Sequence, residues 1–439
     1  MTPGARIAAA IELLEAVARE SEPPDQTLDA FFRRRRYAGS GDRRAITERL
    51  YAVLRRRARL DWWLERTGLD LTPTPRLRIL ADLAMSDRTS PAEMAALFDG
   101  AKHRPAPLDD AERQVADALY GRPLRHRDMP DHVTMEYPGW LDRSFQALWG
   151  ARLGVEMSAM NQRAPVDLRV NMLKTTWEEA SDSLTREFVA TEPTPLSPIG
   201  LRLTGRSRLG ATTAFKEGWV EVQDEGSQLI ALLAGAAPGM TVADFCAGAG
   251  GKALAMAATM GIGGGIRGTL HALDVSDYRL ERMTPRLKRA GALRIKRRVI
   301  AAKDDPWVAE SQGTCDRVLV DAPCTGTGAW RRDPDARWRF EPQDLDDIRE
   351  TQRRILGQAA GLVAPGGRLI YATCSLLQEE NEQQLMWFLE HHKRFQPLPI
   401  DRVWAETVGG PPPPTGPSLR LSPASTGTDG FFCAVLESH

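Results

Sequence analysis

The chain passes from an apolar run of strand length into a glycine-rich turn at Val242-Ala243-Asp244-Phe245-Cys246-Ala247-Gly248-Ala249-Gly250-Gly251-Lys252. A P-loop is excluded, because Cys246 stands where its first glycine is required and Ala253 stands where a Ser or Thr follows the lysine. The dinucleotide fingerprint GxGxxG is also not met, because the three glycines leave none at the sixth position. The stretch therefore predicts a strand, a glycine turn and a helix, an arrangement suited to a nucleotide-like cofactor.

Carboxylates stand at the ends of the strands that follow. Asp274 and Asp321 are the last residues of two predicted strands, and Asp304 lies two residues beyond another. Singly, such an Asp is more often an N-cap or a turn residue. Ligands of open α/β sheets bind outside the carboxyl ends of the strands, where a carboxylate can take both hydroxyls of a ribose. The joint placement therefore predicts one crevice lined by these side chains.

Two cysteines fifty residues apart occupy the same kind of position. Cys324 follows the apolar run of Val318-Leu319-Val320-Asp321-Ala322-Pro323-Cys324-Thr325-Gly326, and Cys374 follows that of Arg368-Leu369-Ile370-Tyr371-Ala372-Thr373-Cys374-Ser375-Leu376. Each thiol is thus expected at the carboxyl end of a strand, where ligands bind. Two such thiols beside a cofactor turn predict cysteine-based covalent chemistry.

Strands alternate with helices from about residue 215 onward, which predicts βαβ units, a mostly parallel sheet and an α/β fold. The predicted strands are Thr241–Phe245, Thr269–Asp274, Arg298–Ala302, Arg317–Asp321, Arg368–Thr373 and Gly430–Leu436. Residues 261–265 are expected to form a loop.

Two other regions precede this alternation. Residues 1 to about 128 show helical spacing of apolar residues and breaks that contain proline, and Trp62 and Trp63 are expected in the core of this helical region. Residues 129 to about 210 predict a small α+β module that begins with a helix. Its predicted elements are helices at Trp140–Met160 and Glu178–Phe188 and strands at Asp167–Asn171 and Gly200–Leu203.

Composition limits the class of protein. Lys+Arg and Asp+Glu are both 58, so the net charge is zero and gives no indication of partners. Five scattered cysteines without a CxxC pair predict neither a disulfide framework nor a zinc site. No apolar stretch approaches the roughly 20 residues of a membrane span. We therefore expect a soluble, cytoplasmic protein without metal or membrane partners, acting as a monomer.

Four motifs of the second half resemble those of the RsmB/Sun (Fmu) family of RNA cytosine-C5 methyltransferases. They are residues 244–252, Asp274-Val275-Ser276-x-x-Arg279-Leu280, Asp321-Ala322-Pro323-Cys324-Thr325-Gly326-Thr327-Gly328 and Ala372-Thr373-Cys374-Ser375-Leu376. Supporting segments are Leu168–Asn171, Val222–Ser227, Arg332–Asp335, Glu380-Asn381-Glu382 and Gly427–Phe432. The resemblance runs from about residue 130 to the C-terminus. Gly41 to Trp63 is similar to the NusB-like helical domain of the members that act on bacterial small-subunit ribosomal RNA. The cofactor loop departs from the usual Ala-Pro-Gly-Gly-Lys-Thr.

This resemblance implies a fold and a cofactor. The expected domains are a helical NusB-like RNA-binding domain at 1–128, a small α+β RNA-recognition module at 129–212 and a Rossmann-like methyltransferase domain at 213–439. The cofactor implied is S-adenosylmethionine. The residues implied to bind it are Cys246, Ala247, Gly248, Ala249, Gly250, Gly251, Lys252, Asp274, Asp304 and Asp321.

The resemblance also implies a reaction. Carbon C5 of cytosine is a poor nucleophile until a thiolate adds at C6. The family assigns this attack to Cys374, the release step to Cys324, and stabilisation of the ring at N3 and the exocyclic amine to Asp321. The implied activity is methylation of a cytosine C5 in RNA, with 16S ribosomal RNA as the first expectation. A transfer RNA methyltransferase and a catalytically silent RNA-binding or ribosome-assembly factor stay open as alternatives.

An RNA partner gives a meaning to two further features. Eleven arginines lie between Arg33 and Arg59 against two acids, and such a run is usually a solvated helical face. With RNA implied, contact with phosphates is expected instead. The segment that follows Cys324 contains four side chains that we expect to stack on unstacked bases. They are Trp330, Arg331, Arg332 and Trp338.

Overall fold

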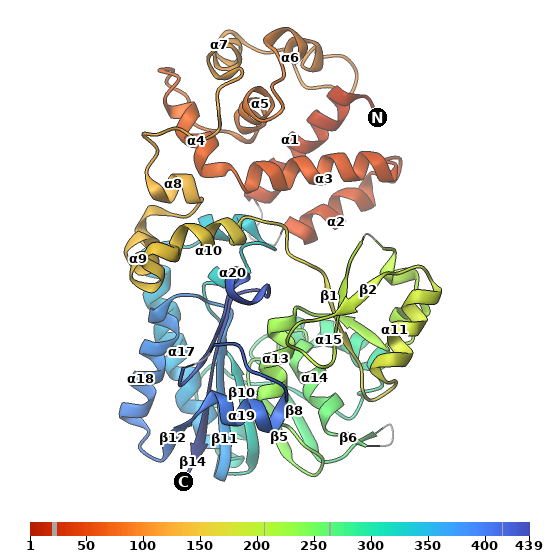
Figure 1. Cartoon of the computed structure of the whole chain (residues 1–439), viewed down its shortest axis with the longest axis vertical. Helices are drawn as coiled ribbons and strands as arrows, with labels where there is room; N and C mark the ends of the chain where they lie inside the picture. The colour runs from red at the N-terminus through yellow and green to blue at the C-terminus, as the bar shows by residue number, and fades with distance from the viewer. Residues whose placement is uncertain (20–23, 206, 263–264, 415) are drawn as a thin grey trace. The chain divides into compact units, whose positions relative to one another are not determined.

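The computed structural model describes residues 1–19, 24–205, 207–262, 265–414 and 416–439 (Figure 1). Its contacts divide the chain into two compact units. The first consists of Met1–Gln162 with Trp330–Glu341, and the second of Arg163–Ala329 with Pro342–His439. This division differs from the expected bounds 1–128, 129–212 and 213–439, and that three-domain division stays a prediction.

The first unit is helical in its described residues, as the sequence predicts. Proline and capping residues begin several helices: Ser90 caps the helix whose first residue is Pro91, and Thr74 caps the helix that starts at Pro75. Trp62 and Trp63 are buried, which confirms their place in the helical core. The NusB-like character of the unit stays a prediction. The helices are α1 (Pro3–Arg19), α2 (Pro24–Arg34), α3 (Ser40–Leu54), α4 (Arg57–Glu65), α5 (Pro75–Met85), α6 (Pro91–Leu97), α7 (Asp110–Leu119), α8 (Asp131–Met135), α9 (Asp142–Trp149) and α10 (Leu153–Met160), with 3-10 turns η1 (Gly139–Leu141), η2 (Gly150–Arg152) and η5 (Pro334–Trp338).

The single helix predicted over Trp140–Met160 is wrong. Helix α9 ends at Trp149, and α10 begins only at Leu153. Between them Gly150 has φ 49°, a left-handed conformation that interrupts a right-handed helix and that glycine adopts at little cost.

A small antiparallel sheet opens the second unit. Its strand order is β2-β3-β1-β4, and β1 pairs with both β3 and β4. The strands predicted at Asp167–Asn171 and Gly200–Leu203 and the helix predicted at Glu178–Phe188 are confirmed, with small shifts at their ends. The elements are β1 (Asp167–Val170), α11 (Trp177–Arg186), β2 (Thr191–Pro193), β3 (Gly200–Leu203), η3 (Leu209–Ala211), α12 (Thr213–Lys216) and β4 (Val220–Val222).

A large mixed sheet forms the rest of the unit, in the order β12-β14-β11-β10-β5-β8-β9, with β13 beside β14. Strands β11, β10, β5, β8 and β9 run parallel, and β14 returns antiparallel to β11. This confirms the α/β fold expected from the alternation. The strands are β5 (Thr241–Asp244), β8 (Thr269–Asp274), β9 (Lys296–Val299), β10 (Cys315–Asp321), β11 (Val363–Thr373), β12 (Phe395–Leu398), β13 (Leu419–Leu421) and β14 (Phe431–Ser438).

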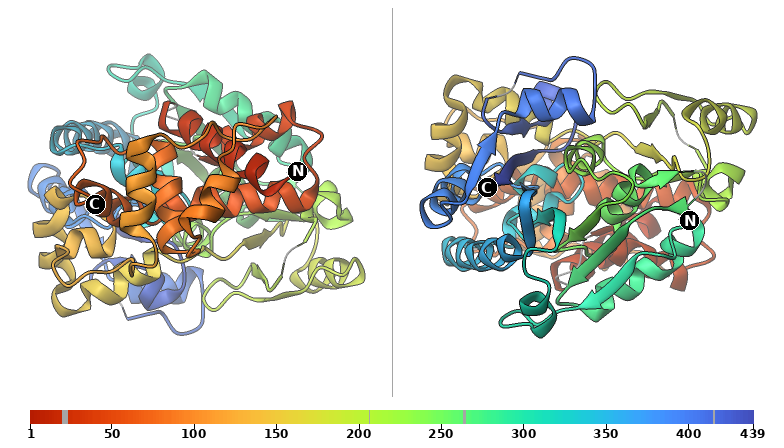
Figure 2. Two further views of the ribbon diagram at one scale, coloured as in Figure 1. Left: turned by 90° about the horizontal axis from the view of Figure 1, so that it is seen from above. Right: turned by 90° about the horizontal axis from the view of Figure 1, so that it is seen from below.

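Helices cover both faces of this sheet (Figure 1 and Figure 2). Since successive side chains of a strand point to opposite faces, neighbouring residues of one strand pack against different helices. Val242 and Leu319 pack with α13, α14, α15 and α19, whereas Ala243 and Val318 pack with α16, α17 and α18. The helical elements are α13 (Glu225–Leu233), α14 (Gly251–Thr259), α15 (Asp277–Ala290), α16 (Pro306–Glu310), η4 (Thr327–Ala329), α17 (Pro342–Leu362), η6 (Gln378–Glu380), α18 (Glu382–His391), α19 (Ile400–Thr407) and α20 (Pro423–Thr426).

Two predictions about the sheet region need correction. The strand expected at Arg298–Ala302 lies earlier, at β9, because Asp274 at the end of β8 pairs with Val299. The expected loop at 261–265 contains a short antiparallel pair, β6 (Gly261–Ile262) and β7 (Gly265–Ile266), and residues 263–264 lie outside the described part of the chain.

Candidate active site

The glycine turn connects β5 to α14. Gly250 has φ 82°, and a Cβ on it would lie 2.5 Å from Cγ of Met283, so glycine is required by conformation and by space. The turn is held by Asp274 at the end of β8, which accepts hydrogen bonds from the backbone N–H groups of Gly248 (2.9 Å) and Ser276 (2.8 Å). The structure therefore brings Asp274 to the predicted cofactor turn.

Lys252 joins this turn to the end of β10. Its Nζ lies 2.5 Å from Oδ2 of Asp321, and it also stands 5.5 Å from the ring centre of Phe431. Burial opposes the charge of Lys252, but the carboxylate of Asp321, and in lesser measure Cys374, raise its pKa. Lys252 is therefore an ammonium group at neutral pH, within electrostatic reach of both.

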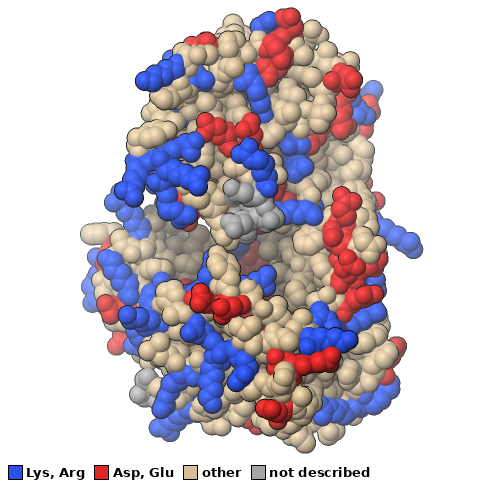
Figure 3. All heavy atoms as spheres, turned by 180° about the vertical axis from the view of Figure 1, so that it is seen from behind, with Lys and Arg blue, Asp and Glu red and all other residues tan. Residues whose placement is uncertain are grey.

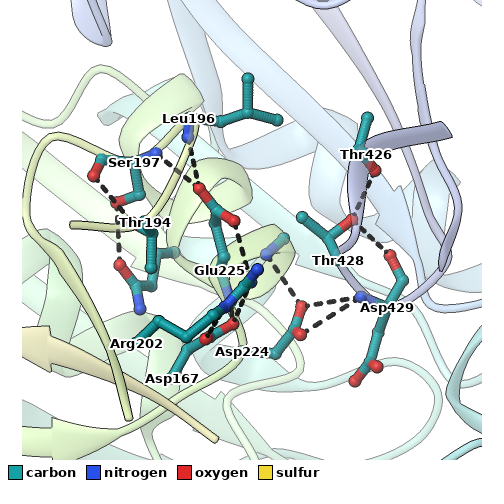
Figure 4. A network of polar contacts seen from close by, with 12 residues as sticks. Asp167, Thr194, Leu196, Ser197, Arg202, Asp224, Glu225, Thr426, Thr428 and Asp429 are labelled. Atoms are coloured by element: carbon teal, nitrogen blue, oxygen red, sulfur yellow. Dashed lines mark hydrogen bonds and ion pairs between the residues drawn. The ribbon is translucent and has the colours of Figure 1, made fainter. Parts of the chain in front are cut away.

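A network of polar contacts at the start of α13 holds the chain segment that carries Phe431 (Figure 4). Arg202 of β3 pairs with Asp167 (2.7 Å) and with Glu225 (3.2 Å). The neighbouring Asp224 accepts a hydrogen bond from the backbone of Asp429 (3.2 Å). The small sheet, α13 and the segment before β14 are thereby joined, and Phe431 is placed beside Lys252.

Asp244 is a residue that the sequence analysis did not single out. It ends β5, is 1% exposed, and neither carboxylate oxygen has a hydrogen-bond partner of good geometry in the described structure. Burial and the nearby carboxylate of Asp321 raise its pKa to about 7, against the opposing charge of Lys252. Its position as the last residue of an apolar strand, directly before the glycine turn, was the available signal.

The two predicted thiols meet at the ends of neighbouring parallel strands. Asp321 of β10 pairs with Ala372 of β11, so Cys324 and Cys374 follow their strands at the same edge of the sheet. Their sulfur atoms are 3.4 Å apart, and both are free thiols, half-buried. The hydrogen bond to Cys374, burial and the charge of Glu380 all raise the pKa of the Cys324 thiol.

The other three cysteines lie in the hydrophobic core. Cys315 and Cys433 are buried, and Cys246 is half-buried against the same core as Phe245. Burial raises the pKa of each of these thiols. These three sulfurs are therefore small apolar groups of the core.

Glu380 is a second residue whose role the sequence did not reveal, since it stood only in a supporting motif. It is fully buried, and its carboxylate accepts hydrogen bonds from Thr325 and Ser375, the residues that follow the two thiols. The thiols are thus connected through a shared carboxylate.

Asp304 lies apart from these contacts. It is exposed and has φ 53°, and the carboxylate that organises its loop is that of Asp305, which caps α16. Because β9 ends at Val299 rather than at Ala302, Asp304 is the fifth residue after the strand end instead of the second.

The expectation that Trp330 stacks on bases is wrong for the free protein. Trp330 is 2% exposed and packs edge-on against Phe145 (5.7 Å between ring centres). Arg331 is buried as well, while Arg332 and Trp338 are half-buried. Arg337, which was not singled out, is buried beside Trp330 and donates to the backbone oxygens of Glu136 and Met160.

Most of the arginines between Arg33 and Arg59 are engaged within the first unit. Arg49 and Arg56 pair with buried Asp82, and Arg59 pairs with buried Glu136. Partners are also found for Arg35, Arg43, Arg44, Arg55 and Arg57. Arg33, Arg34 and Arg36 are exposed and have no ion pair with any described residue.

Two other features, a metal site and a membrane-spanning helix, are absent from the described residues. No three His, Cys, Asp or Glu side chains gather as a metal site there. Within the same residues, no helix has the length and apolar character needed to cross a bilayer.

Comparison with known proteins identifies the family. Residues 231–437 match the family model described as 16S rRNA methyltransferase RsmB/F, and residues 137–209 match its ferredoxin-like domain. A probable ribosomal RNA small subunit methyltransferase B of Synechocystis sp. is 32% identical over 419 residues, covering 90% of this chain and 91% of that protein.

Solved structures give the same result. A methyltransferase homologue from Pyrococcus horikoshii has a TM-score of 0.60 and 26% identity, covering 70% of this chain and 97% of its own. NSun6 from the same organism, determined with SFG, shares the fold with a TM-score of 0.58 and 19% identity, over 69% of this chain and 98% of its own. The chain therefore belongs to the RsmB/F family of RNA methyltransferases, which use S-adenosylmethionine.

Proposed function

We propose that this protein methylates C5 of a cytosine in 16S ribosomal RNA through a covalent bond between Cys374 and C6 of the base. The observation that carries the proposal is the pair of thiols 3.4 Å apart, next to the Lys252–Asp321 ion pair at one sheet edge. Relatives named ribosomal RNA small subunit methyltransferase B support the choice of RNA.

The residues of the turn fit the expected cofactor. Gly248 has open space where a side chain would stand, so a ligand can approach the backbone closely. The buried, unpartnered Asp244 suits a cationic group such as the ammonium of an amino acid. Asp274 has carboxylate oxygens suited to ribose hydroxyls. We assign the cofactor to the turn 246–252 with Asp244, Asp274 and Asp321, and the role of Asp304, which is exposed beyond the end of β9, stays a prediction.

We expect Asp274→Ala to weaken binding of S-adenosylmethionine about ten- to hundredfold, since hydrogen bonds to a charged group contribute about 1.5–3 kcal/mol. Isothermal titration calorimetry measures this. Asp277→Ala serves as the matched control, because that carboxylate is exposed in the first turn of α15, three residues away. Equal affinities of wild type and Asp274→Ala would remove Asp274 from the cofactor site.

The first step belongs to Cys374 and Asp321. The Cys374 thiolate forms the S–C6 bond, and the electrons of the ring move toward C5, while Asp321 faces N3 and the exocyclic amine. Lys252 places an ammonium group within electrostatic reach of Cys374. When bound, S-adenosylmethionine supplies an electrophilic methyl group for C5.

Release requires a base for the C5 proton. As this proton leaves, the C5–C6 double bond re-forms, and the S–C6 bond breaks with its electron pair returning to Cys374. We assign the base to Cys324, whose sulfur lies 3.4 Å from the sulfur of Cys374 in the free protein. Cys324 acts as a thiolate in this step: it passes its own proton to water and then takes the proton from C5.

The test is methylation of purified RNA. Unmodified 16S ribosomal RNA and transfer RNA are incubated separately with the protein and S-adenosylmethionine carrying a labelled methyl group, and bisulfite sequencing locates 5-methylcytosine. We expect one labelled cytosine in 16S ribosomal RNA. Label in transfer RNA alone would favour that substrate, and no label in either, with RNA still bound, would favour the silent RNA-binding protein.

The distribution of charge on the surface limits which residues can contact RNA phosphates. In Figure 3, Lys and Arg side chains form separate groups with acidic side chains among them, rather than one continuous basic surface. In the first unit Arg33, Arg34 and Arg36 are the exposed arginines of the run that we propose for phosphate contact. In the second unit all four residues of β9, Lys-Arg-Arg-Val, are exposed at the sheet edge.

Replacing Arg33, Arg34 and Arg36 together by Gln should lower RNA affinity and its salt dependence. Each lost phosphate contact reduces the slope of log K against log salt by about 0.7–0.9, so the slope should fall by about 2 to 3. Filter binding from low to high salt measures it. A triple Gln variant at Arg44, Arg113 and Arg152, exposed arginines paired with acids three or four residues away in the chain, is the control. If the first variant keeps the wild-type slope, these three arginines do not contact phosphates and form only a solvated face.

A further inference from the structure

The Glu380 carboxylate connects the two thiol-bearing turns. Its Oε1 accepts from the backbone N–H of Thr325 (2.9 Å), and its Oε2 accepts from the hydroxyls of Thr325 and Ser375. Thr325 follows Cys324, and Ser375 follows Cys374. This buried carboxylate therefore links the two turns, because it accepts hydrogen bonds from both.

Neighbouring contacts hold the same arrangement. Gln352 of α17 donates both to Oε1 of Glu380 (3.1 Å) and to the backbone oxygen of Pro323 (3.0 Å), so the Cys324 turn is held on both sides. The Gly328 N–H donates to the backbone oxygen of Cys374 (2.8 Å). A Cβ on Gly328 would lie 2.1 Å from the backbone oxygen of Gly430, so the turn has no room to move in that direction.

The charges around the two thiols differ in sign. The titratable groups that face Cys324 are Cys374, Glu380 and Tyr371, and the charge of Glu380 raises the Cys324 pKa. The group that faces Cys374 with a positive charge is Lys252, itself paired with Asp321. Burial raises the pKa of Glu380, whereas its four hydrogen-bond donors favour its anionic form.

We propose that Glu380 is a positioning residue that makes the two thiols chemically unequal: it holds the Cys324 turn against the Cys374 turn and places a negative charge beside Cys324, so Cys374 is the more reactive nucleophile of the two. This inference rests on the proposed function for its meaning, since the nucleophile must be Cys374. The inequality itself is a property of the free protein and can be measured without RNA or cofactor.

The experiment compares the alkylation rates of the two thiols. Full-length protein is treated with limiting iodoacetamide between pH 6 and 9, and mass spectrometry of the two peptides gives the ratio of Cys374 to Cys324 modification. In wild type Cys374 should react faster. Glu380→Gln should reduce the ratio at pH 7 about tenfold, since a pKa difference of one unit changes a thiolate fraction tenfold. Glu380→Asp, which keeps the charge, should restore the preference for Cys374.

Two variants separate charge from hydrogen bonding and from folding. Ser375→Ala removes one donor but keeps the carboxylate, so its ratio should stay within about twofold of wild type. Glu382→Gln is the matched control, because Glu382 pairs with Arg420 and contacts neither Thr325 nor Ser375. An unchanged ratio in Glu380→Gln, or an equal change in Ser375→Ala, would overturn the proposal. If Glu380→Gln does not fold, the ratio in Glu380→Asp decides: a preference for Cys374 supports the charge, and its loss refutes it.

Methylation assays add a second readout. Glu380→Gln should lower kcat at least tenfold and leave cofactor affinity unchanged, because the contacts of its carboxylate are to the thiol turns and not to the turn 246–252. If wild type methylates no RNA and the alkylation ratios still behave as stated, the proposed function fails and the role of Glu380 stands. If wild type methylates RNA and the ratios do not change, the role of Glu380 fails alone.

Discussion

Cys324→Ala protein, incubated with S-adenosylmethionine and 16S ribosomal RNA, is expected to accumulate as a covalent protein–RNA complex. Cys374 can still form the S–C6 bond in this variant, because its position depends on β11 and on Ser375 rather than on the Cys324 sulfur. Loss of the C5 proton then lacks its base, so the adduct does not break down. Denaturing electrophoresis should show a band of reduced mobility that disappears on RNase treatment.

The matched variants fix the order of the two thiols. Cys374→Ala should lose methylation to background and form no adduct, and the double variant should behave like Cys374→Ala. Cys315→Ala changes a buried core cysteine and should neither trap RNA nor lose activity. A trap in Cys374→Ala would reverse the roles of the two cysteines. If neither variant traps while both lose activity, Cys324 has a structural role instead.

Asp244→Asn is expected to stabilise the protein without cofactor while weakening cofactor binding. Asp244 is protonated in the folded protein up to about pH 7, and an unfolded Asp ionises near its ordinary value of 3.8. The folded pKa is raised, so ionisation favours unfolding, and stability from this group falls as pH rises from about 4 to about 7. At 1.36 kcal/mol per pKa unit, a pKa difference of about three units lowers the free energy of unfolding by about 4 kcal/mol above pH 7.

Chemical denaturation between pH 5.5 and 8.5 measures this difference. Asp244→Asn should have the higher free energy of unfolding at pH 8, and the gain should shrink as pH falls, because wild-type Asp244 becomes neutral. Its cofactor affinity should be lower at pH 8 and should no longer depend on pH in this range. Asp277→Asn, at an exposed carboxylate, should show neither effect. A gain that is independent of pH would mean that Asp244 is ionised throughout.

The features that were predicted correctly from the sequence are those that depend on the local pattern of apolar and polar residues. The alternation of apolar strands with helices predicted the α/β fold, and β5, β8, β10 and β11 lie where it placed them, to within a few residues. Polar residues directly after apolar strands predicted the edge where Asp274, Asp321, Cys324 and Cys374 gather. This works because parallel strands all end at one edge, so position along each strand determines position in the site.

Contacts between distant segments were decided only by the tertiary structure. The arginines of the run 33–59 appeared available for RNA, yet Arg49 pairs with Asp82 and Arg59 with Glu136, 33 and 77 residues away. Trp330 was expected to be exposed and to stack on bases, but it is buried. It belongs to the segment Trp330–Glu341, which is part of the first unit although it follows residues of the second unit in the chain. A charge or an aromatic ring has the same local signature whether it is buried with a partner or exposed.

Glu380 and Asp244 show the same limit within the site itself. Glu380 is 55 residues from Thr325, so no spacing in the chain indicates that its carboxylate holds that residue. Asp244 stands in a motif, but its raised pKa follows from complete burial near Asp321, which only the packed sheet produces. Sequence determined which groups reach the edge of the sheet. Tertiary structure decided their burial, their separation and their charges, because these depend on every element packed around them.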